Sequence, residues 1–479
     1  MEFYGHIIDG VEVESLDGAR MDSIDPYTRE PWAAVALGGR ADAARAVAAA
    51  RKAFDEGPWP RMGYEKRQTL LHRLADLMIE NAEALALADS RDMGKPIAQA
   101  RHDVARSAWN FRFFADHARL TAGENYPMDS GHHAYSRFGP AGVVSAIAPW
   151  NFPLMLETWK VAPALAWGNT EVLKPAEDTP VSAVLLGRLA IEAGFPPGVL
   201  NVVQGYGPDS AGAELTENVD VDRITFTGES GTGRIIGGVA AKRLCPVSLE
   251  LGGKGANIVF ADADLDNAVE WSVQAIFRNA GQVCLAGSRL YVQREVYDEF
   301  LDRFVAAAEA MQIGDPKDDA TQFGPLASEE HWTKVSSYLD GIEADGGKVL
   351  TGGHGEGWFV RPTIVVDAPA GARVCTEEIF GPVVVVHPFD TEAEAVRLAN
   401  DTRYGLNAML FTENLSRAHR VSEALKAGTV WVNCFFIRDL RAPFGGVGDS
   451  GVGREGGAFS REFFTEPKAV VMQISPDRG

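Results

Sequence analysis

The spacing of hydrophobic residues divides the first half of the chain into a helical segment and an alternating strand-helix segment. Between residues 42 and 125, apolar residues recur three or four positions apart with charges between them, a pattern typical of several amphipathic helices. Short apolar runs, typical of buried strands, follow at residues 143–148, 172–174, 200–203, 223–227 and 257–260. Helical patterns at 154–167 and 181–193 separate some of them, which gives about 30 residues per strand-helix unit. This rhythm predicts a parallel, doubly wound, Rossmann-like sheet.

The second half of the chain repeats this style without repeating the sequence. Strand-like runs at 290–293, 383–386 and 429–432 alternate with helical patterns at 296–310 and 392–399. We therefore expect a second α/β domain. The glycine-rich segment 445–457 is expected to be an ordered loop that leads into a terminal packing segment, because Phe444 precedes it and Phe459, Phe463 and Phe464 follow.

Length and charge exclude several classes of protein. The 479 residues exceed about three domains of usual size. A net charge of -21 opposes binding to nucleic acid and to anionic membranes. The four cysteines lie far apart and form no CxxC pair, so we expect reduced thiols and no metal site. With charged residues at the N-terminus and no long apolar run, a cytoplasmic protein is expected.

Two predicted strand ends carry polar residues that can contact a ligand. Asn151 lies in the segment 147–154, where a strand gives way to a helix, and its amide can stabilise an oxyanion by about 3 kcal/mol. A simple helix cap is the alternative. Lys174 and Glu177 follow the next strand. A carboxylate there can accept hydrogen bonds from both ribose hydroxyls of NAD and would repel the 2′-phosphate of NADP. Taken alone, such a pair is more often a solvated surface ion pair.

A third strand end, at residues 226–233, leads into a glycine-rich helix start whose free amides can attract phosphate. The segment has no GxGxxG pattern and no Lys-Ser/Thr after GxxxxG, which excludes a triphosphate-binding P-loop. Further along, Glu250 is flanked by leucines and Cys284 by small and polar residues. A desolvated glutamate can act as a base and an accessible thiol as a nucleophile, while an inert buried thiol remains the alternative.

Seven motifs together resemble the aldehyde dehydrogenase superfamily in order and spacing over essentially the whole chain. They are IAPWNFPL at 147–154, the Lys174 and Glu177 pair, FTG at 226–228, LELGGK at 249–254, GQVC at 281–284, EEIFGPV at 377–383 and PFGG at 443–446. The resemblance implies an NAD-binding domain (1–120 and 141–250), a catalytic domain (251–440) and a bridging element (121–140 and 455–479) that makes homodimers or homotetramers.

The resemblance also implies roles for single residues. Cys284 would be the nucleophile, Glu250 the general base, and Asn151 with the Cys284 backbone amide the oxyanion hole. The implied NAD contacts are Ile147, Pro149, Trp150, Lys174, Glu177, Gly207, Pro208, Gly228, Glu229, Gly233, Leu251, Glu378 and Phe380. Glu229 departs from the serine that is common in the family at this position, which leaves a side-chain contact to the pyrophosphate open.

Within the superfamily, residues 431–446 look most like the 2-hydroxymuconic and 2-aminomuconic semialdehyde dehydrogenases. That likeness implies that Arg106 and Arg438 bind a substrate carboxylate, which a guanidinium can pair in a bidentate manner. Structural salt bridges are the alternative for both arginines. A broad-specificity aldehyde dehydrogenase, a CoA-acylating relative and a non-catalytic protein of the same fold also remain open at this point.

Overall fold

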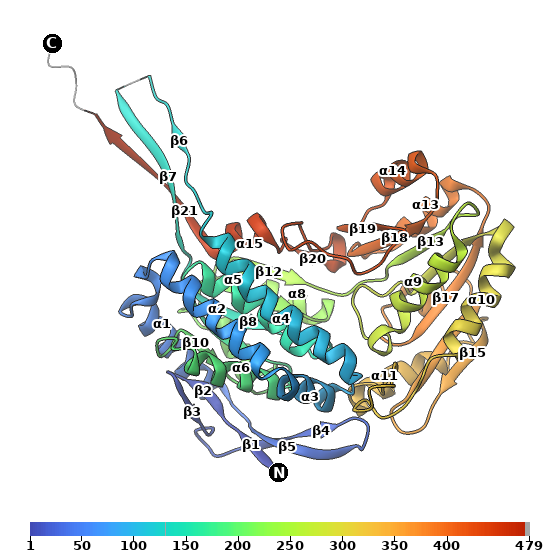
Figure 1. Ribbon diagram of the computed structural model, residues 1–479, viewed down its shortest axis with the longest axis horizontal. Helices are drawn as coiled ribbons and strands as arrows, with labels where there is room; N and C mark the ends of the chain where they lie inside the picture. The colour runs from blue at the N-terminus through green and yellow to red at the C-terminus, as the bar shows by residue number, and fades with distance from the viewer. Residues whose placement is uncertain (130, 475–479) are drawn as a thin grey trace.

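The computed structural model describes residues 1–129 and 131–474, which form two large sheets with their helices, a small N-terminal sheet and a projecting arm (Figure 1). The first sheet has eight strands in the order β20 (Gly451–Val452), β12 (Val247–Glu250), β11 (Arg223–Thr227), β8 (Val143–Ile147), β9 (Thr170–Lys174), β10 (Leu200–Val202), β2 (His6–Ile8) and β3 (Val11–Val13). The five strands from β12 to β10 are parallel. The chain runs from β8 outward to β10 and returns to β11 on the other side of β8. A topological switch point, where doubly wound sheets bind ligands, therefore lies between β8 and β11.

Alternation along β8 explains why both faces of this sheet are covered. Val144 and Ala146 pack into one core, while Val143 and Ile147 pack into the other. The first core is closed by α2 (Tyr64–Glu80), α3 (Ala82–Met93), α4 (Ile97–Ala118), α5 (Pro153–Ala166) and α6 (Val181–Glu192). The second is closed by α1 (Arg40–Asp55), α7 (Ala211–Glu217) and α8 (Ser230–Lys242). The prediction of a doubly wound α/β fold is confirmed.

The second sheet has seven strands in the order β15 (Lys348–His354), β16 (Val360–Val366), β17 (Val383–Phe389), β14 (Arg289–Gln293), β13 (Ala256–Val259), β18 (Asn407–Phe411) and β19 (Thr429–Val432). On one face lie α9 (Leu265–Phe277), α10 (Tyr297–Glu309) and α11 (Glu329–Leu339). On the other lie α13 (Glu392–Asn400) and α14 (Leu415–Ala424). One expectation is corrected, because β13 lies between β14 and β18 in this second sheet and does not continue the first series of strands.

The arm is a three-stranded antiparallel sheet of β6 (Asn125–Tyr126), β7 (His132–Pro140) and β21 (Thr465–Gln473). It projects from the body of the molecule, and α15 (Gly457–Phe464) leads into it (Figure 1). Its exposed apolar side chains include Tyr126, Val471 and Met472. The predicted bridging element covers this arm, although residue 130 and residues 475–479 of that prediction lie outside the described residues.

Several short elements were not predicted. The N-terminal segment forms β2 and β3 at one edge of the first sheet and a separate three-stranded sheet of β1 (Glu2–Tyr4), β4 (Arg20–Asp25) and β5 (Glu30–Ala36). The glycine-rich segment 445–457 is more than a loop, because its β20 pairs with β12. The remaining short elements are α12 (Arg373–Thr376) and the 3-10 turns η1 (Trp59–Arg61), η2 (Arg278–Gly281), η3 (Arg294–Val296) and η4 (Gly448–Ser450). In the described part of the chain, no helix is long and apolar enough to cross a membrane.

Candidate active site

A cavity of about 400 Å³ lies at the switch point, between the carboxyl ends of the first sheet and loops of the second. Its walls come from the segments after β8, β9, β11 and β12 and from the loops that precede β14 and β17. The cavity therefore brings together residues that are up to about half the chain apart in sequence. Ten predicted site residues line it: Pro149, Trp150, Asn151, Glu177, Gly228, Glu229, Leu251, Cys284, Glu378 and Phe380.

The other predicted residues lie outside the walls of this cavity. Ile147 and Lys174 are the buried last residues of β8 and β9, and Glu250 is the buried last residue of β12. Gly233 lies one turn into α8, where an added Cβ would come within 2.5 Å of Leu251 Cδ2. Gly207 and Pro208 lie in the loop after β10, two strands away from the switch point.

The loop that carries the thiol is locked to the loop after β8. Asn151 Nδ2 donates to the Gln282 carbonyl at 2.9 Å, and Asn279 Nδ2 donates to the Asn151 carbonyl at 2.8 Å. These reciprocal bonds hold Asn151, which is only 3% exposed, beside the loop of Cys284. One N–H of the Asn151 amide remains for an oxyanion that forms at the sulfur.

The two glycines of the LELGGK motif, Gly252 and Gly253, lie where there is no room for a side chain. A Cβ on Gly253 would come within 2.4 Å of the Cys284 carbonyl oxygen, and a Cβ on Gly252 within 2.0 Å of Glu378 Oε2. The Gly253 N–H also donates to Glu378 Oε1 at 2.7 Å. The backbone after Glu250 thus contacts both the nucleophile loop and the loop of Glu378, where any larger residue would separate them.

The electrostatics of the site favour neutral acids before substrate binds. Burial, with Glu378 and Glu250 nearby, raises the pKa of the Cys284 thiol to about 12. Burial also raises the pKa of Glu378 to about 7 and, together with Glu455, holds the pKa of Glu250 well above its ordinary value. Both carboxyl oxygens of Glu250 are buried without a hydrogen-bond partner. A raised pKa and a free carboxyl suit a residue that takes a proton during the reaction.

Glu455 connects this base to the first sheet and was not predicted. It lies in the glycine-rich segment 445–457, accepts a hydrogen bond from Trp159 Nε1, and lies 3.4 Å from Lys160 Nζ. Lys160 in turn donates to Thr225 Oγ1 at 3.0 Å. Burial is the main cause of the raised pKa of Glu250; Glu455 raises this pKa further and Lys160 lowers it.

The cavity can hold a dinucleotide. Lys174 Nζ donates to the Pro175 carbonyl at 2.8 Å and lies 3.5 Å from Glu177 Oε2, which places the ammonium and the carboxylate together at the end of β9. The amino end of α8 opens onto the cavity and has no side-chain cap, so its N–H groups are free to bind phosphate. These features fit the ribose and pyrophosphate of NAD.

Sequence reasoning missed the contribution of α11. His331 and Lys334 lie on this helix and line the cavity, together with Ser328, which caps it by accepting a hydrogen bond from the His331 N–H at 3.3 Å. Lys334 Nζ lies 3.9 Å from Glu229, across the cavity opening. The sequence shows only an amphipathic helix here. No local pattern indicates that this helix faces loops of the other sheet.

The two predicted substrate arginines lie near each other and near the thiol. Arg438, on the segment after β19, has its guanidinium carbon 3.7 Å from the Phe444 ring centroid and 4.8 Å from that of Trp159. Its Nη2 is buried without a hydrogen-bond partner. Burial and the neighbouring charge of Arg106 lower the pKa of Arg438 to about 10. Two adjacent cations with an unpaired donor form a site that attracts an anion.

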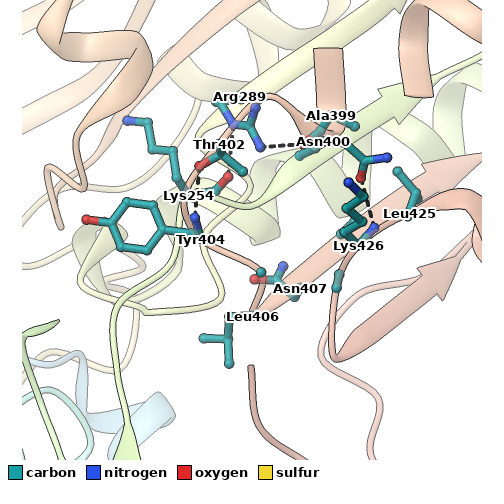
Figure 2. Close-up of a pocket in the computed structure, with 14 residues that line it drawn as sticks. Lys254, Arg289, Ala399, Asn400, Thr402, Tyr404, Leu406, Asn407, Leu425 and Lys426 are labelled. Carbon is teal, nitrogen blue, oxygen red and sulfur yellow. Dashed lines mark hydrogen bonds between the residues drawn. The ribbon is translucent and has the colours of Figure 1, made fainter. Parts of the chain in front are cut away.

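A separate pocket lies at the amino ends of β13, β14 and β18, and its walls do not include Cys284 (Figure 2). Arg289 donates to the Lys254 carbonyl at 2.9 Å and to the Ala399 carbonyl at 2.8 Å, which ties β14 to the segment after β12. The free volume of about 10 Å³ holds about one water molecule, so we assign it no ligand. Lys254 is 2% exposed, and its Nζ has no hydrogen-bond partner. Among the described residues, no group of His, Cys, Asp and Glu is placed to hold a metal ion.

Comparison with known proteins assigns the chain to a family. Residues 13–470 match the aldehyde dehydrogenase family. The chain is 49% identical over 482 residues to a 2-hydroxymuconic semialdehyde dehydrogenase of Pseudomonas sp. (strain CF600), which covers 98% of this chain and 99% of the relative. It is 43% identical over 493 residues to a 2-aminomuconic 6-semialdehyde dehydrogenase of Pseudomonas sp., which covers 100% of both chains.

A solved structure agrees with this assignment. The NAD+ complex of an aldehyde dehydrogenase from Bacillus cereus superposes with a TM-score of 0.96 at 40% identity, covering 98% of this chain and 97% of that chain. The family and the cofactor in that complex support the prediction of an NAD-dependent oxidoreductase. The chain belongs to the aldehyde dehydrogenase family.

Proposed function

We propose that this aldehyde dehydrogenase oxidises a semialdehyde that bears a carboxylate, of the muconic semialdehyde class, to the corresponding dicarboxylic acid with NAD. The observation that carries the proposal is Arg438, whose buried Nη2 has no partner and whose charge lies beside that of Arg106. Arg438 also lowers the pKa of Cys284 and of Glu250, which places its charge near the reacting atoms. The two relatives named above act on substrates of this class.

In the proposed reaction the Cys284 thiol loses its proton to solvent, and the thiolate attacks the aldehyde carbon to form a hemithioacetal. Asn151 Nδ2 and the Cys284 backbone N–H stabilise the oxyanion that develops on the former carbonyl oxygen. NAD, when bound, accepts the hydride that leaves this carbon. The acyl group then remains on Cys284 as a thioester.

Hydrolysis of that thioester requires a base. The Glu250 carboxylate takes a proton from water, and the resulting hydroxide attacks the thioester carbon. The C–S bond then breaks and the sulfur takes the proton back from Glu250, which releases the acid and the Cys284 thiol. The raised pKa of Glu250 supports this role, because a carboxylate of ordinary pKa would be a weaker base. Lys174, Glu177, the start of α8, Glu378 and Phe380 are the residues we propose to hold NAD.

An NADH-release assay tests the proposal. The purified enzyme is compared on 2-hydroxymuconic, 2-aminomuconic and succinic semialdehydes and on aromatic and aliphatic aldehydes without a carboxylate. We expect kcat/KM to be highest for the muconic semialdehydes. Equal or higher values for neutral aldehydes would instead identify a broad-specificity enzyme. A rate that depends on added CoA would identify an acylating enzyme, and Cys284→Ser is the inactive control.

We further propose that the chain has two domains and a bridging element, each with its own function. Residues 1–120 and 141–250 form the NAD-binding domain, 251–440 the catalytic domain, and 121–140 with 455–479 a bridging element. The exposed apolar residues on the arm support its packing against a second copy of the chain in a homodimer or homotetramer. Light scattering of the intact enzyme measures this oligomeric state.

We also propose a cytoplasmic location, which suits a catalytic thiol because that compartment is reducing.

A further inference from the structure

Three aromatic side chains from distant parts of the chain meet in the wall of the cavity. Trp150 follows β8, His331 lies in the first turn of α11, and Phe380 lies between α12 and β17. The ring centroids of Trp150 and His331 are 4.8 Å apart, those of Trp150 and Phe380 5.2 Å, and those of His331 and Phe380 5.9 Å. His331 thus contacts both other rings and belongs to neither of their loops.

His331 also makes a hydrogen bond that fixes its tautomer. Its Nε2 lies 2.8 Å from the Phe380 carbonyl oxygen, which can only accept, so Nε2 carries the hydrogen. Burial lowers the pKa of His331 to about 4, and the ring is therefore neutral at physiological pH. The remaining 8% of its surface that is exposed faces the cavity.

The residue that accepts this bond has an unusual backbone. Phe380 has φ of 61°, in the left-handed region that residues other than glycine seldom adopt. Such a conformation persists only where neighbouring groups hold it. The carbonyl of Phe380 itself is held by His331, so the bond acts on the strained residue directly.

The helix that carries His331, α11, packs against the loop of Phe380 and Gly381, and this loop packs against the loop of Cys284. Ser328 caps it, and Val335 packs so closely on Gly381 that an added Cβ would come within 2.9 Å of Val335 Cγ1. Gly381 also packs on Gly281, where an added Cβ would come within 2.3 Å of the Gly381 carbonyl carbon. The start of α11 is therefore a rigid support for residues 380 and 381 and, through them, for the loop of Cys284.

We propose that His331 is a positioning residue for the cofactor: its Nε2–H holds the Phe380 carbonyl, and its ring packs Phe380 against Trp150 to form a fixed wall for the nicotinamide end of NAD. This inference rests on the proposed function, in which Phe380 contacts NAD. It assigns to His331 no contact with the aldehyde and no proton transfer.

Two substitutions separate the hydrogen bond from the ring. His331→Phe keeps an aromatic ring but removes the donor, whereas His331→Gln keeps an N–H donor of similar reach. His354→Phe is the matched control, because His354 is exposed on β15 and pairs with Asp340 at 2.9 Å. For each protein we would measure KM for NAD, KM for the aldehyde, the Kd of NADH by fluorescence, and the melting temperature.

We expect His331→Phe to raise KM for NAD and the Kd of NADH about two- to tenfold, the effect of one lost hydrogen bond, with KM for the aldehyde unchanged. His331→Gln should recover most of the loss, and His354→Phe should match the wild type. Unchanged NAD and NADH binding in His331→Phe would overturn the proposal, as would equal losses in the Phe and Gln variants. If His331→Phe does not fold, His331→Gln alone tests the proposal. A tenfold higher KM for NAD in His331→Gln would contradict the donor role, because this variant keeps an N–H donor. Failure of the proposed function would appear separately, as no NADH formation by the wild type with any aldehyde, while NADH binding still tests His331.

Discussion

Removal of Arg438 should convert the enzyme from one that prefers carboxylate-bearing aldehydes to one that does not. In the structure the guanidinium lies between the rings of Trp159 and Phe444 and keeps one buried N–H free. A hydrogen bond to a charged group contributes about 1.5–3 kcal/mol. Since about 1.4 kcal/mol corresponds to a factor of ten, Arg438→Ala should lower kcat/KM for muconic semialdehydes relative to neutral aldehydes about 10- to 150-fold.

The ratio between the two substrate classes is the informative quantity. Arg438 also lowers the pKa of Cys284 and Glu250, so its loss should slow neutral aldehydes somewhat as well. Arg438→Lys retains the charge but loses the planar fork and should give an intermediate ratio. Arg441→Ala is the matched control, because Arg441 lies on the same segment, is mostly exposed and pairs with Asp439.

Initial rates of NADH formation at 340 nm, with both substrate classes and saturating NAD, give the required values of kcat/KM. Arg106→Ala should reduce the ratio less, because Arg106, on α4, has the carboxylate of Asp439 nearby to offset its charge. Equal losses for carboxylate-bearing and neutral aldehydes in Arg438→Ala would refute the reasoning, since they would show that the arginine supports the fold or the base alone.

Three further predictions concern the base, the cofactor and the fold. Glu250→Gln should release one burst of NADH per active site in stopped-flow measurements and then stall, since hydride transfer does not need the base and thioester hydrolysis does; steady turnover at the wild-type rate would contradict this. Glu177→Ser should raise KM for NAD and allow measurable use of NADP, because the carboxylate that would repel the 2′-phosphate is gone; strict NAD use by the variant would contradict the assignment. Lys254→Met should stabilise the protein near neutral pH. Burial lowers the pKa of Lys254 to about 7, so between pH 7 and about 10 the unfolded chain binds more protons than the folded one, and the free energy of unfolding of the wild type rises with pH. The penalty removed by Met is on the order of 1.4 kcal/mol for each unit of the pKa shift, is largest below pH 7 and fades toward pH 10. Calorimetry at pH 7 and pH 9.5 measures it, and a difference in Tm that does not change with pH would refute the titration argument.

Much of the fold could be predicted because buried parallel strands are recognisable as short apolar runs. The strands β8, β9, β11 and β14 lie where these runs predict them. Many strands that escaped prediction are short, antiparallel or at sheet edges, although the interior strands β12, β16 and β18 were missed as well. An example at a sheet edge is β20, whose two residues pair with β12 through the backbone alone and leave no pattern of side chains in a glycine-rich segment.

The candidate site divides in the same way. Asn151, Glu177 and Cys284 could be found because each belongs to a local motif at the end of a strand or in a short loop. The contributions of α11 and of Glu455 could not, because they depend on how a helix or a terminal segment of one unit packs on loops of another. Glu250 and Glu455 are 205 positions apart in the sequence, yet Glu455 raises the pKa of Glu250.

Burial strengthens the electrostatic interactions among Arg438, Cys284 and Glu250, and the sequence contains no direct measure of burial. The net charge of -21 gives the surface a field that repels an anionic semialdehyde, and mobile ions screen that field beyond about 8 Å. The rings of Trp159 and Phe444 keep water and mobile ions away from the Arg438 guanidinium, so salt does not screen its charge there. Its attraction for a carboxylate is therefore strong but acts only over a short distance. The same lack of water raises the pKa of both Cys284 and Glu250 before substrate arrives. A bound carboxylate would offset the charge of Arg438 and raise the proton affinity of Glu250 further, which strengthens this residue as a base when the thioester must be hydrolysed.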